Sequence, residues 1–346
     1  MPWYSEFMDS TVSMLFYGSM LMLTLCCIVA IIIERYRYKK MSVFDLKNKH
    51  VVITGGSSGI GKCLAVEAIQ RGANVTIIAR DEQKLNNTKR DIIQHCIYST
   101  QRVFTASLDL STNNYEEIEK AMHSIEQEGG PIFMLFNCAG MAICGKLEDI
   151  SPSDIRKLHD LNCLGSIMTT RAVIEGMKSR GEGHIIFVSS QSGLIGIYGL
   201  TAYSASKFAL RGFAEALQME VQTYGIKITI AYPPDTDTPG FAVENQGKPK
   251  ETKLICQAAG LFQPEVVAGQ MFRDALAGMF ASTVGADGFM VLTLTTGMSP
   301  CRTVLQLMSE LFLMSAFRVV AVCYLFTFKK IIENCMVAKN KSKKPQ

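Results

Sequence analysis

Short apolar runs alternate with amphipathic stretches from about residue 49 to residue 232. The runs are four to seven residues long and rich in Ile and Val, as is typical of strands buried on both faces. The stretches between them have helical spacing, so we predict an α/β fold with a doubly wound parallel sheet. The expected strands are His50–Ile53, Asn74–Ala79, Arg102–Ala106, Ile132–Asn137, His184–Ser190 and Lys227–Tyr232, with a last strand at Asp287–Leu292. The expected helices are Gly59–Arg71, Glu82–Cys96, 112–127, 152–178 and 201–223.

A longer apolar run precedes this region. Residues 12–33 contain no charged side chain and would span roughly 33 Å as a helix, close to the thickness of a bilayer core. Four basic residues lie between positions 35 and 40, and no Lys or Arg precedes the run. By the positive-inside rule we predict a lumenal segment at 1–11, an uncleaved transmembrane anchor at 12–33 and a cytosolic basic linker at 34–48. A removed signal peptide is the alternative.

The C-terminal end is also apolar. Residues 311–328 would span a bilayer poorly, because Arg318 near their centre costs about 2.5–3.5 kcal/mol at mid-bilayer. We therefore predict a membrane-associated segment at 301–336 that does not cross, with a tight hairpin from about 289 to 328 as the alternative. The basic tail at 337–346 ends in Lys343-Lys344-Pro345-Gln346, which resembles a dilysine retrieval signal. The expected location is the endoplasmic reticulum membrane, with a catalytic domain at 49–300 facing the cytosol.

Charge and composition exclude several classes of protein. With 35 basic and 31 acidic residues, the net charge is only +4, so no nucleic-acid partner is implied. Eleven scattered cysteines without a C-x-x-C motif suit a reducing compartment and indicate neither a disulfide framework nor a zinc site. The five histidines lack metal-ligand spacing, so we expect no metal.

A glycine-rich stretch follows the first expected strand. It runs from Thr54 to Gly61 and opens the first expected helix. Glycines there let the backbone turn tightly and approach a pyrophosphate, which the amides and dipole of the helix N-terminus attract. The strand-to-helix context is the one that this motif requires, so the sequence predicts a Rossmann-type dinucleotide site.

The second expected strand ends at Arg80. An acid near this point favours NAD, whereas an arginine favours the 2′-phosphate of NADP. Arg80 and Lys84, one helical turn later, therefore favour NADPH, although Asp81 between them blurs the distinction.

The candidate chemistry centres on Tyr203 and Lys207. Residues four apart share one face of a helix, and an ammonium beside a phenol lowers the pKa of the phenol. We therefore expect Tyr203 to donate a proton near neutral pH. Ser190, at the end of the fifth expected strand, would bind a substrate oxygen.

The chain from about residue 49 to residue 292 resembles the short-chain dehydrogenase/reductases. Six motifs occur in the order of that family: Thr54–Gly61, Asp109, Asn137–Gly140, Leu161–Gly165, Ser190, and Tyr203 with Lys207. Two positions depart from the family pattern. Cys138 stands where the family often has a second asparagine, and Pro234 stands where glycine usually follows Pro233.

The resemblance implies cofactor-binding roles for the matching residues. Asp109 is expected to contact the adenine, Asn137 the adjoining ribose, and Thr238 the carboxamide. The pyrophosphate side would be held by Gly55, Ser57, Ser58, Gly59, Ile60 and Gly61. Dimers or tetramers through the helices at 152–178 and 201–223 are usual in the family.

It implies catalytic roles as well. Hydride would pass from the nicotinamide to a carbonyl carbon while Tyr203 protonates the oxygen. Lys207 would contact the nicotinamide ribose, and Asn162 would anchor a water that relays protons to Lys207. Ser190 would orient the carbonyl, with Ser189 either beside it or satisfied within the sheet.

The loop after the sixth expected strand points to a substrate. Residues 233–255 resemble the corresponding loop of the family members in the sphingolipid pathway, which reduce a long-chain sphingoid ketone with NADPH. Such a substrate is a cation that lies in a membrane leaflet, and we expect Asp235, Asp237 or Glu244 to meet its ammonium. Turn capping is the alternative for each acid. Two other functions stay open: a membrane-anchored steroid or retinoid dehydrogenase, and a catalytically silent NADP-binding scaffold or sensor.

Overall fold

The computed structural model describes residues 22, 24–26, 28–29, 31–36, 39–40, 44–112, 114–257 and 260–342. The predicted anchor at 12–33 therefore lies largely outside the described residues, and those of its residues that are described are helical. The dilysine pair at 343–344 also lies outside them.

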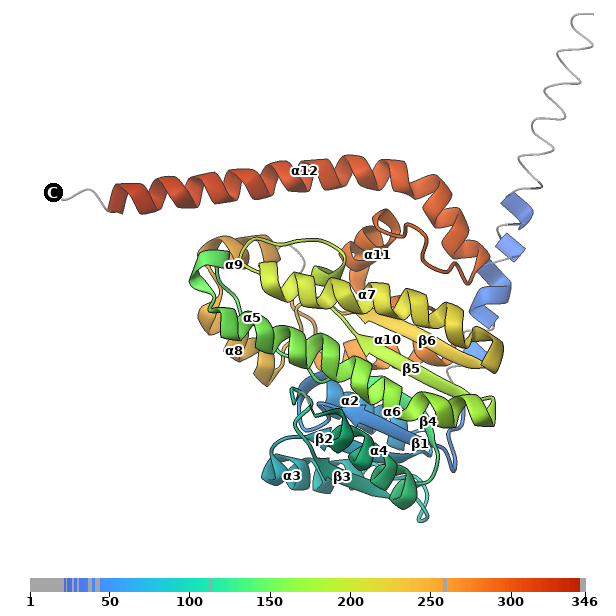
Figure 1. The fold of residues 1–346 in the computed structure, drawn as a ribbon. Coiled ribbons are helices and arrows are strands. Elements are labelled where there is room, and N and C mark those ends of the chain that lie inside the picture. Colours follow the sequence, from blue (N-terminus) through green and yellow to red (C-terminus); the bar gives the residue numbers. More distant parts are fainter. Residues whose placement is uncertain are drawn as a thin grey trace, which may run out of the picture.

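A seven-stranded parallel sheet forms the centre of the molecule (Figure 1). Its strand order is β3-β2-β1-β4-β5-β6-β7, so the direction of winding reverses between β1 and β4. The strands are β1 (His50–Thr54), β2 (Asn74–Ala79), β3 (Val103–Ser107), β4 (Ile132–Asn137), β5 (Gly183–Val188), β6 (Ile226–Tyr232) and β7 (Ala281–Thr283). This order confirms the predicted doubly wound fold, and it places a ligand crevice at the carboxyl ends of β1 and β4.

Helices cover both faces of the sheet, as the apolar runs predicted. Successive strand residues point to opposite faces, so Val51 and Ile53 join one hydrophobic cluster and Val52 the other. The first cluster includes residues of α2 (Gly59–Ile69), α3 (Glu82–Ile93) and α10 (Pro264–Leu276). The second includes residues of α4 (Tyr115–Gly129), α6 (Gly165–Arg180) and α7 (Thr201–Val221).

The helix predicted at 152–178 has an internal irregularity. It consists of α5 (Pro152–His159), a π-helical turn at Asp160–Leu164 and then α6. Such turns inside α-helices often occur at functional sites. Here the π-helical turn carries Asn162, one of the predicted catalytic residues.

The predicted last strand at Asp287–Leu292 is wrong. These residues lie in α11 (Gly285–Leu294), and the three-residue β7 pairs with β6 instead. A four-residue apolar run does not distinguish a strand from a helix. The helix is favoured because Met290, Val291 and Leu294 then face one cavity at helical spacing.

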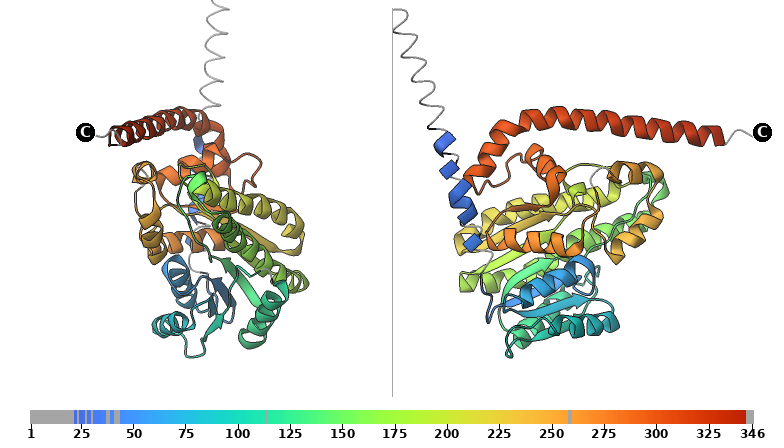
Figure 2. Two further views of the ribbon diagram at one scale, coloured as in Figure 1. Left: turned by 60° about the vertical axis from the view of Figure 1, so that its left-hand side comes forward. Right: turned by 180° about the vertical axis from the view of Figure 1, so that it is seen from behind.

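The C-terminal segment forms α12 (Val304–Ser342), which crosses over the catalytic domain (Figures 1 and 2). The predicted substrate loop folds into α8 (Pro239–Gly247) and α9 (Lys250–Cys256), and α9 contacts α12 through the ion pair of Glu251 with Lys339 (Figure 1). Among the described residues, one helix is long and apolar enough to cross a membrane, at residues 304–339.

Stability should fall on acidification because His184 on β5 is buried. Burial lowers the pKa of His184 to about 3, and its Nε2 lies 3.1 Å from the Thr229 hydroxyl. The unfolded chain, with an ordinary histidine pKa near 6.5, then binds more protons than the folded chain as pH falls below about 6.5. This one residue would cost up to about 2 kcal/mol by pH 5. The apparent Tm in detergent, measured between pH 7 and pH 5, should fall less steeply in His184→Gln than in the wild type; an equal slope would contradict this assignment.

Candidate active site

One cavity of about 790 Å³ opens at the carboxyl ends of the central strands. It lies at the winding reversal between β1 and β4, where open α/β sheets bind ligands. Twelve of the predicted site residues line this cavity: Gly55, Ser58, Gly59, Ile60, Gly61, Arg80, Lys84, Ser189, Ser190, Tyr203, Lys207 and Thr238. The structure therefore brings the glycine-rich loop, the basic pair and the Tyr-Lys pair to one place.

The glycine-rich loop is packed too closely for side chains. Gly55 has a φ of +67°, which favours glycine, and a Cβ there would lie 2.9 Å from the Cα of Ala139. A Cβ on Gly61 would overlap the carbonyl oxygen of Gly55. Ser58 occupies the N-cap of α2 but makes no side-chain capping hydrogen bond. The backbone N–H groups of the first turn thus stay available for an anion.

Arg80 and Lys84 line the same cavity from the end of β2 and the start of α3. Asp81, the residue that blurred the cofactor prediction, has a local partner. It is the N-cap of α3, and its Oδ1 accepts a hydrogen bond of 2.9 Å from the backbone N–H of Lys84. One oxygen of its carboxylate is therefore engaged by its own helix, and the other lies 3.6 Å from the Lys84 ammonium.

Tyr203 and Lys207 share one face of α7, but their electrostatics differ from the prediction. The Lys207 Nζ lies 5.8 Å from the centroid of the Tyr203 ring and donates a hydrogen bond of 2.9 Å to the carbonyl oxygen of Val188. The predicted net lowering of the Tyr203 pKa is wrong, because the other surroundings of the phenol outweigh the charge of Lys207. Burial and then the charge of Glu244 raise the pKa of Tyr203, and the hydrogen bond with Ser190 offsets only part of the rise. The phenol is therefore protonated at neutral pH, which is the form that donates a proton.

Lys207 is itself shaped by burial. Only 5% of the residue is exposed, and burial lowers the pKa of Lys207 to about 8. Ser189, which directly follows β5, links this strand to α7. Its hydroxyl donates a hydrogen bond of 3.0 Å to the Lys207 carbonyl oxygen. This contact favours the structural alternative for Ser189. Ser190, at the cavity wall, accepts a hydrogen bond from the backbone N–H of Ser192.

Asn162 holds together the segments beside Lys207. Its side chain is fully buried and bonds both backbone groups of Met141, with Oδ1 accepting at 2.8 Å and Nδ2 donating at 2.9 Å. Nδ2 also donates to the Ser206 hydroxyl at 3.0 Å. A Cβ on Gly140 would lie 3.1 Å from the Asn162 Oδ1 and 3.3 Å from the Lys207 Nζ, so both groups lie close to Gly140. Asn162 does not line the cavity, and its water relay stays a prediction.

Three further predicted cofactor residues lie off the cavity wall. Asn137 points toward α6, where it bonds the hydroxyls of Thr169 and Thr170. Asp109 turns toward Ser111. Its Oδ1 accepts hydrogen bonds of 3.0 Å from the Ser111 backbone N–H and 2.7 Å from the Ser111 hydroxyl. The carbonyl oxygen of Ser57 accepts a hydrogen bond from Thr88. Their roles toward the adenine, ribose and pyrophosphate stay predictions.

The substrate loop closes on the glycine-rich loop. Thr238 caps α8 by accepting a hydrogen bond of 3.1 Å from the backbone N–H of Phe241. A Cβ on Gly59 would lie 2.9 Å from the Thr238 methyl group, so the two loops touch at this point. Thr238 thus joins the cofactor end of the cavity to the substrate end.

The outer wall of the cavity was not predicted as a site. Asp287, Met290 and Leu294 line it from α11, and five residues line it from α12: Arg318, Ala321, Tyr324, Leu325 and Phe328. The arginine inside an otherwise apolar run was the one available sequence signal. That signal indicated only that the run does not cross a membrane. It did not place α12 on the cavity wall, because that wall brings together residues far apart in the sequence.

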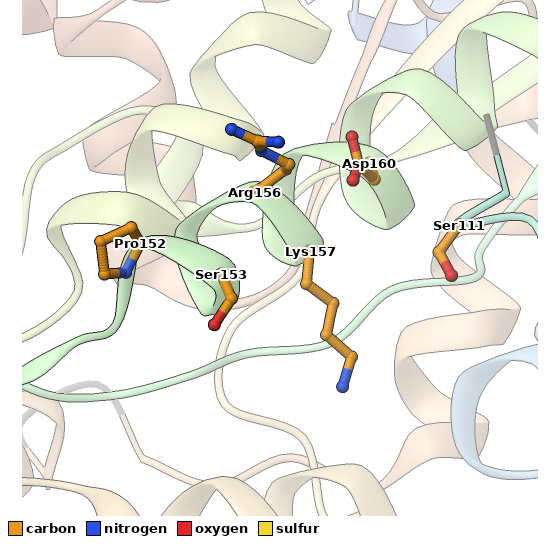
Figure 3. A pocket seen from close by; sticks show the side chains of 6 residues that line it. All are labelled: Ser111, Pro152, Ser153, Arg156, Lys157 and Asp160. Carbon is orange, nitrogen blue, oxygen red and sulfur yellow. The ribbon is translucent and has the colours of Figure 1, made fainter.

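A second, smaller pocket of about 370 Å³ lies beside α5 (Figure 3). Its lining, all within the described ranges, contains none of the predicted site residues: Ser111, Pro152, Ser153, Arg156, Lys157 and Asp160. Arg156 and Lys157 point in different directions, so their charges do not converge on one ligand. The predicted catalytic residues Ser190, Tyr203 and Lys207 line the larger cavity instead.

Comparison with known proteins agrees with this geometry. Residues 49–249 match the family model described as short chain dehydrogenase. The chain is 46% identical to a 3-ketodihydrosphingosine reductase of Bos taurus, across 93% of this chain and 98% of that protein. It is 45% identical to a 3-dehydrosphinganine reductase of Danio rerio, across 94% of this chain and 98% of that protein. A solved short-chain dehydrogenase from Streptomyces avermitilis is 28% identical, with a TM-score of 0.61 across 71% of this chain and 90% of that chain. The chain belongs to the short-chain dehydrogenase family.

Proposed function

We propose that this chain reduces the ketone of 3-ketodihydrosphingosine with NADPH and produces dihydrosphingosine. The observation that carries this proposal is the 46% identity to a reductase named for that ketone, which extends over 98% of that protein. Such breadth includes the substrate loop and α12 as well as the motifs that the whole family shares. The cavity supports the same reaction, because Ser190, Tyr203 and Lys207 line it together.

Each side chain has a distinct task in this proposal. NADPH, when bound, supplies the hydride that reduces the carbonyl carbon. Tyr203 donates its phenolic proton to the carbonyl oxygen, and Ser190 holds that oxygen by a hydrogen bond. Lys207, with a pKa of about 8, is mostly charged at neutral pH and stabilises the phenolate that remains after the transfer.

The residues around the glycine-rich loop fit a dinucleotide. The uncapped first turn of α2 offers N–H groups and a positive helix dipole to the pyrophosphate. Arg80 and Lys84 add positive charge at the end of β2, where the 2′-phosphate of NADPH would lie.

Arg80→Ala should weaken NADPH binding by about 10- to 100-fold and change NADH binding by less than about threefold, because the arginine would pair with a phosphate that NADH lacks. Dissociation constants of both cofactors, measured by fluorescence titration, test this expectation. Arg90→Ala, on the helix α3 that follows Arg80, is the matched control, because that side chain does not line the cavity. An equal loss for the two cofactors in Arg80→Ala would contradict the assignment of Arg80 to the 2′-phosphate.

We also propose that α12 lies on the membrane surface and does not cross it. Residues 304–339 would extend roughly 54 Å as a helix, well beyond a bilayer core. Both halves of the helix contact the catalytic domain. Phe317 packs edge-on against Phe289 of α11, and Lys339 forms an ion pair of 2.7 Å with the fully buried Glu251 of α9.

The outward face of α12 supports a lipid partner. Three apolar side chains of α12, spaced seven residues apart, are each more than 60% exposed: Phe312, Val319 and Phe326. The α12 residues that line the cavity lie between them or follow them in the sequence. An apolar stripe of this size needs a cover, and a membrane interface suits a helix with one embedded face. The substrate would then enter from the leaflet, on the side of the cavity that α12 walls.

An epitope placed after Gln346 should be open to antibody and protease in intact microsomes, on the same side as the catalytic domain. An epitope before Met1 should be protected until detergent is added, because we propose that the N-terminus lies in the lumen of the endoplasmic reticulum. A protected C-terminal epitope would contradict the placement of α12 on the membrane surface.

The proposed function is tested by following NADPH oxidation in membranes that contain the full chain, with 3-ketodihydrosphingosine, a steroid ketone and retinal as parallel substrates. We expect rapid oxidation with the sphingoid ketone alone. Turnover of the steroid or retinal without turnover of the sphingoid ketone would contradict the proposed substrate and leave the family assignment intact.

A further inference from the structure

A buried lysine lies between two carboxylates in the substrate loop. The Lys248 Nζ is 3.0 Å from Oδ2 of Asp235 and 2.9 Å from Oε1 of Glu244, and only 1% of its side chain is exposed. Asp235 follows β6, Glu244 belongs to α8, and Lys248 directly follows α8. Asp235 and Glu244, hereafter the carboxylate pair, line the cavity that holds Tyr203.

The charges in this cluster do not balance. Two carboxylates meet one ammonium, which leaves one negative charge in a largely buried place, where an unpaired charge is costly. Burial raises the pKa of Glu244, although the hydrogen bond and charge of Lys248 oppose the rise. Arg318 and Asp287, which line the cavity from α12 and α11, carry opposite charges and leave the balance unchanged.

Glu244 also has an oxygen to spare. Its contacts with Lys248 and with the Cys144 thiol, the latter 3.8 Å away, both involve Oε1. Within the described part of the chain, Oε2 accepts no hydrogen bond. The cluster therefore has room for a second cation with hydrogen-bond donors.

The carboxylate pair lies close to the reacting end of the cavity. Among charged side chains, Glu244 raises the pKa of Tyr203 most, and Asp235 also contributes. The proposed substrate carries its ammonium on the carbon next to the ketone. A ketone oxygen bound at Tyr203 therefore brings the ammonium into the field of Glu244.

We propose that Glu244, supported by Asp235, binds the ammonium of an amino ketone and so selects such substrates over uncharged ketones. This inference rests on the proposed function. Lys248 is a positioning residue that holds the carboxylate pair in place through its ion pairs with both acids. Asp237, the third acid considered from the sequence, is exposed and does not line the cavity, so it takes no part.

The test compares two ketones of equal chain length, 3-ketodihydrosphingosine and its analogue with hydrogen in place of the ammonium. Glu244→Gln should lower kcat/KM for the amino ketone by about 10- to 100-fold, because a charge-assisted hydrogen bond is lost. In the same variant, kcat/KM for the analogue should fall less than about threefold. The control is Asp237→Asn, which removes an exposed charge from the same loop and should lower kcat/KM for either ketone less than about threefold. An equal loss for both ketones in Glu244→Gln, or no loss for either, would overturn the proposal.

A second measurement uses the wild-type chain, so it does not depend on the folding of a variant. Dodecylamine should raise the Tm of the full-length protein with NADPH at lower concentration than dodecanol does. No preference for the amine would overturn the proposal. Failure of the wild type to reduce 3-ketodihydrosphingosine would instead contradict the proposed function, since the comparison of amine with alcohol requires no turnover.

Discussion

Tyr203→Phe is expected to lower kcat by about 100- to 10,000-fold, the range found for the loss of a positioned general acid. The substitution removes only the phenolic hydroxyl and keeps the ring that packs beside Lys207. Burial keeps the Tyr203 phenol protonated, and the phenol lines the cavity, so we expect it to give the proton to the substrate oxygen. NADPH affinity should stay within about twofold of the wild-type value. The Tyr203 hydroxyl is assigned to the substrate oxygen, so its loss should cost little in cofactor binding.

Single-turnover rates with NADPH and the dissociation constant of NADPH separate these two effects. Tyr115→Phe is the matched control, because it removes the same atom from α4 at the surface, where the hydroxyl bonds Glu119. We expect wild-type kinetics from the control. Turnover that survived in Tyr203→Phe would show that another group donates the proton.

Gly61→Ala should raise the dissociation constant of NADPH by about 100-fold, equivalent to the loss of about one charge-assisted hydrogen bond. A Cβ at this position overlaps the carbonyl oxygen of Gly55 and lies 2.8 Å from the carbonyl carbon. Both are backbone atoms, so the loop must move away from α2. The N–H groups that would hold the pyrophosphate then lose their alignment.

Gly212→Ala provides the control for the same chemical change. This glycine lies in α7, and a Cβ there would meet nothing within 4 Å. We expect unchanged NADPH affinity and a helix that is more stable by up to about 1 kcal/mol. If isothermal titration found equal affinity in Gly61→Ala and the wild type, the glycine-rich loop would not be the pyrophosphate site.

The central sheet could be predicted because local patterns decide it. Strands such as β1 and β5 are buried along their whole length, so their sequences are continuous runs of Ile, Val and Phe. The glycine-rich loop and the Tyr203-Lys207 spacing are likewise local patterns, and the structure places both on the wall of one cavity.

The outer half of the cavity could not be predicted, because contacts between distant segments decide it. The sequence predicts a strand at Asp287–Leu292, and only the packing of these residues beside the cavity shows why they are helical. Helical spacing placed Lys207 beside Tyr203 but carried no information on burial, which raises the pKa of Tyr203. The ion pair of Lys248 with Asp235 depends on how the substrate loop folds back. Its ion pair with Glu244 spans four residues and needs the helix α8, whereas the sequence indicated only a loop there.

The direct test of the proposed reaction is to trace the hydride. The purified full-length protein would be incubated with 3-ketodihydrosphingosine and NADPH that carries deuterium at the transferable position, and the lipid product examined by mass spectrometry. We predict dihydrosphingosine with a single deuterium on the carbon that held the ketone. Unlabelled lipid, together with deuterium transfer to a steroid ketone or to retinal under the same conditions, would contradict the proposed function.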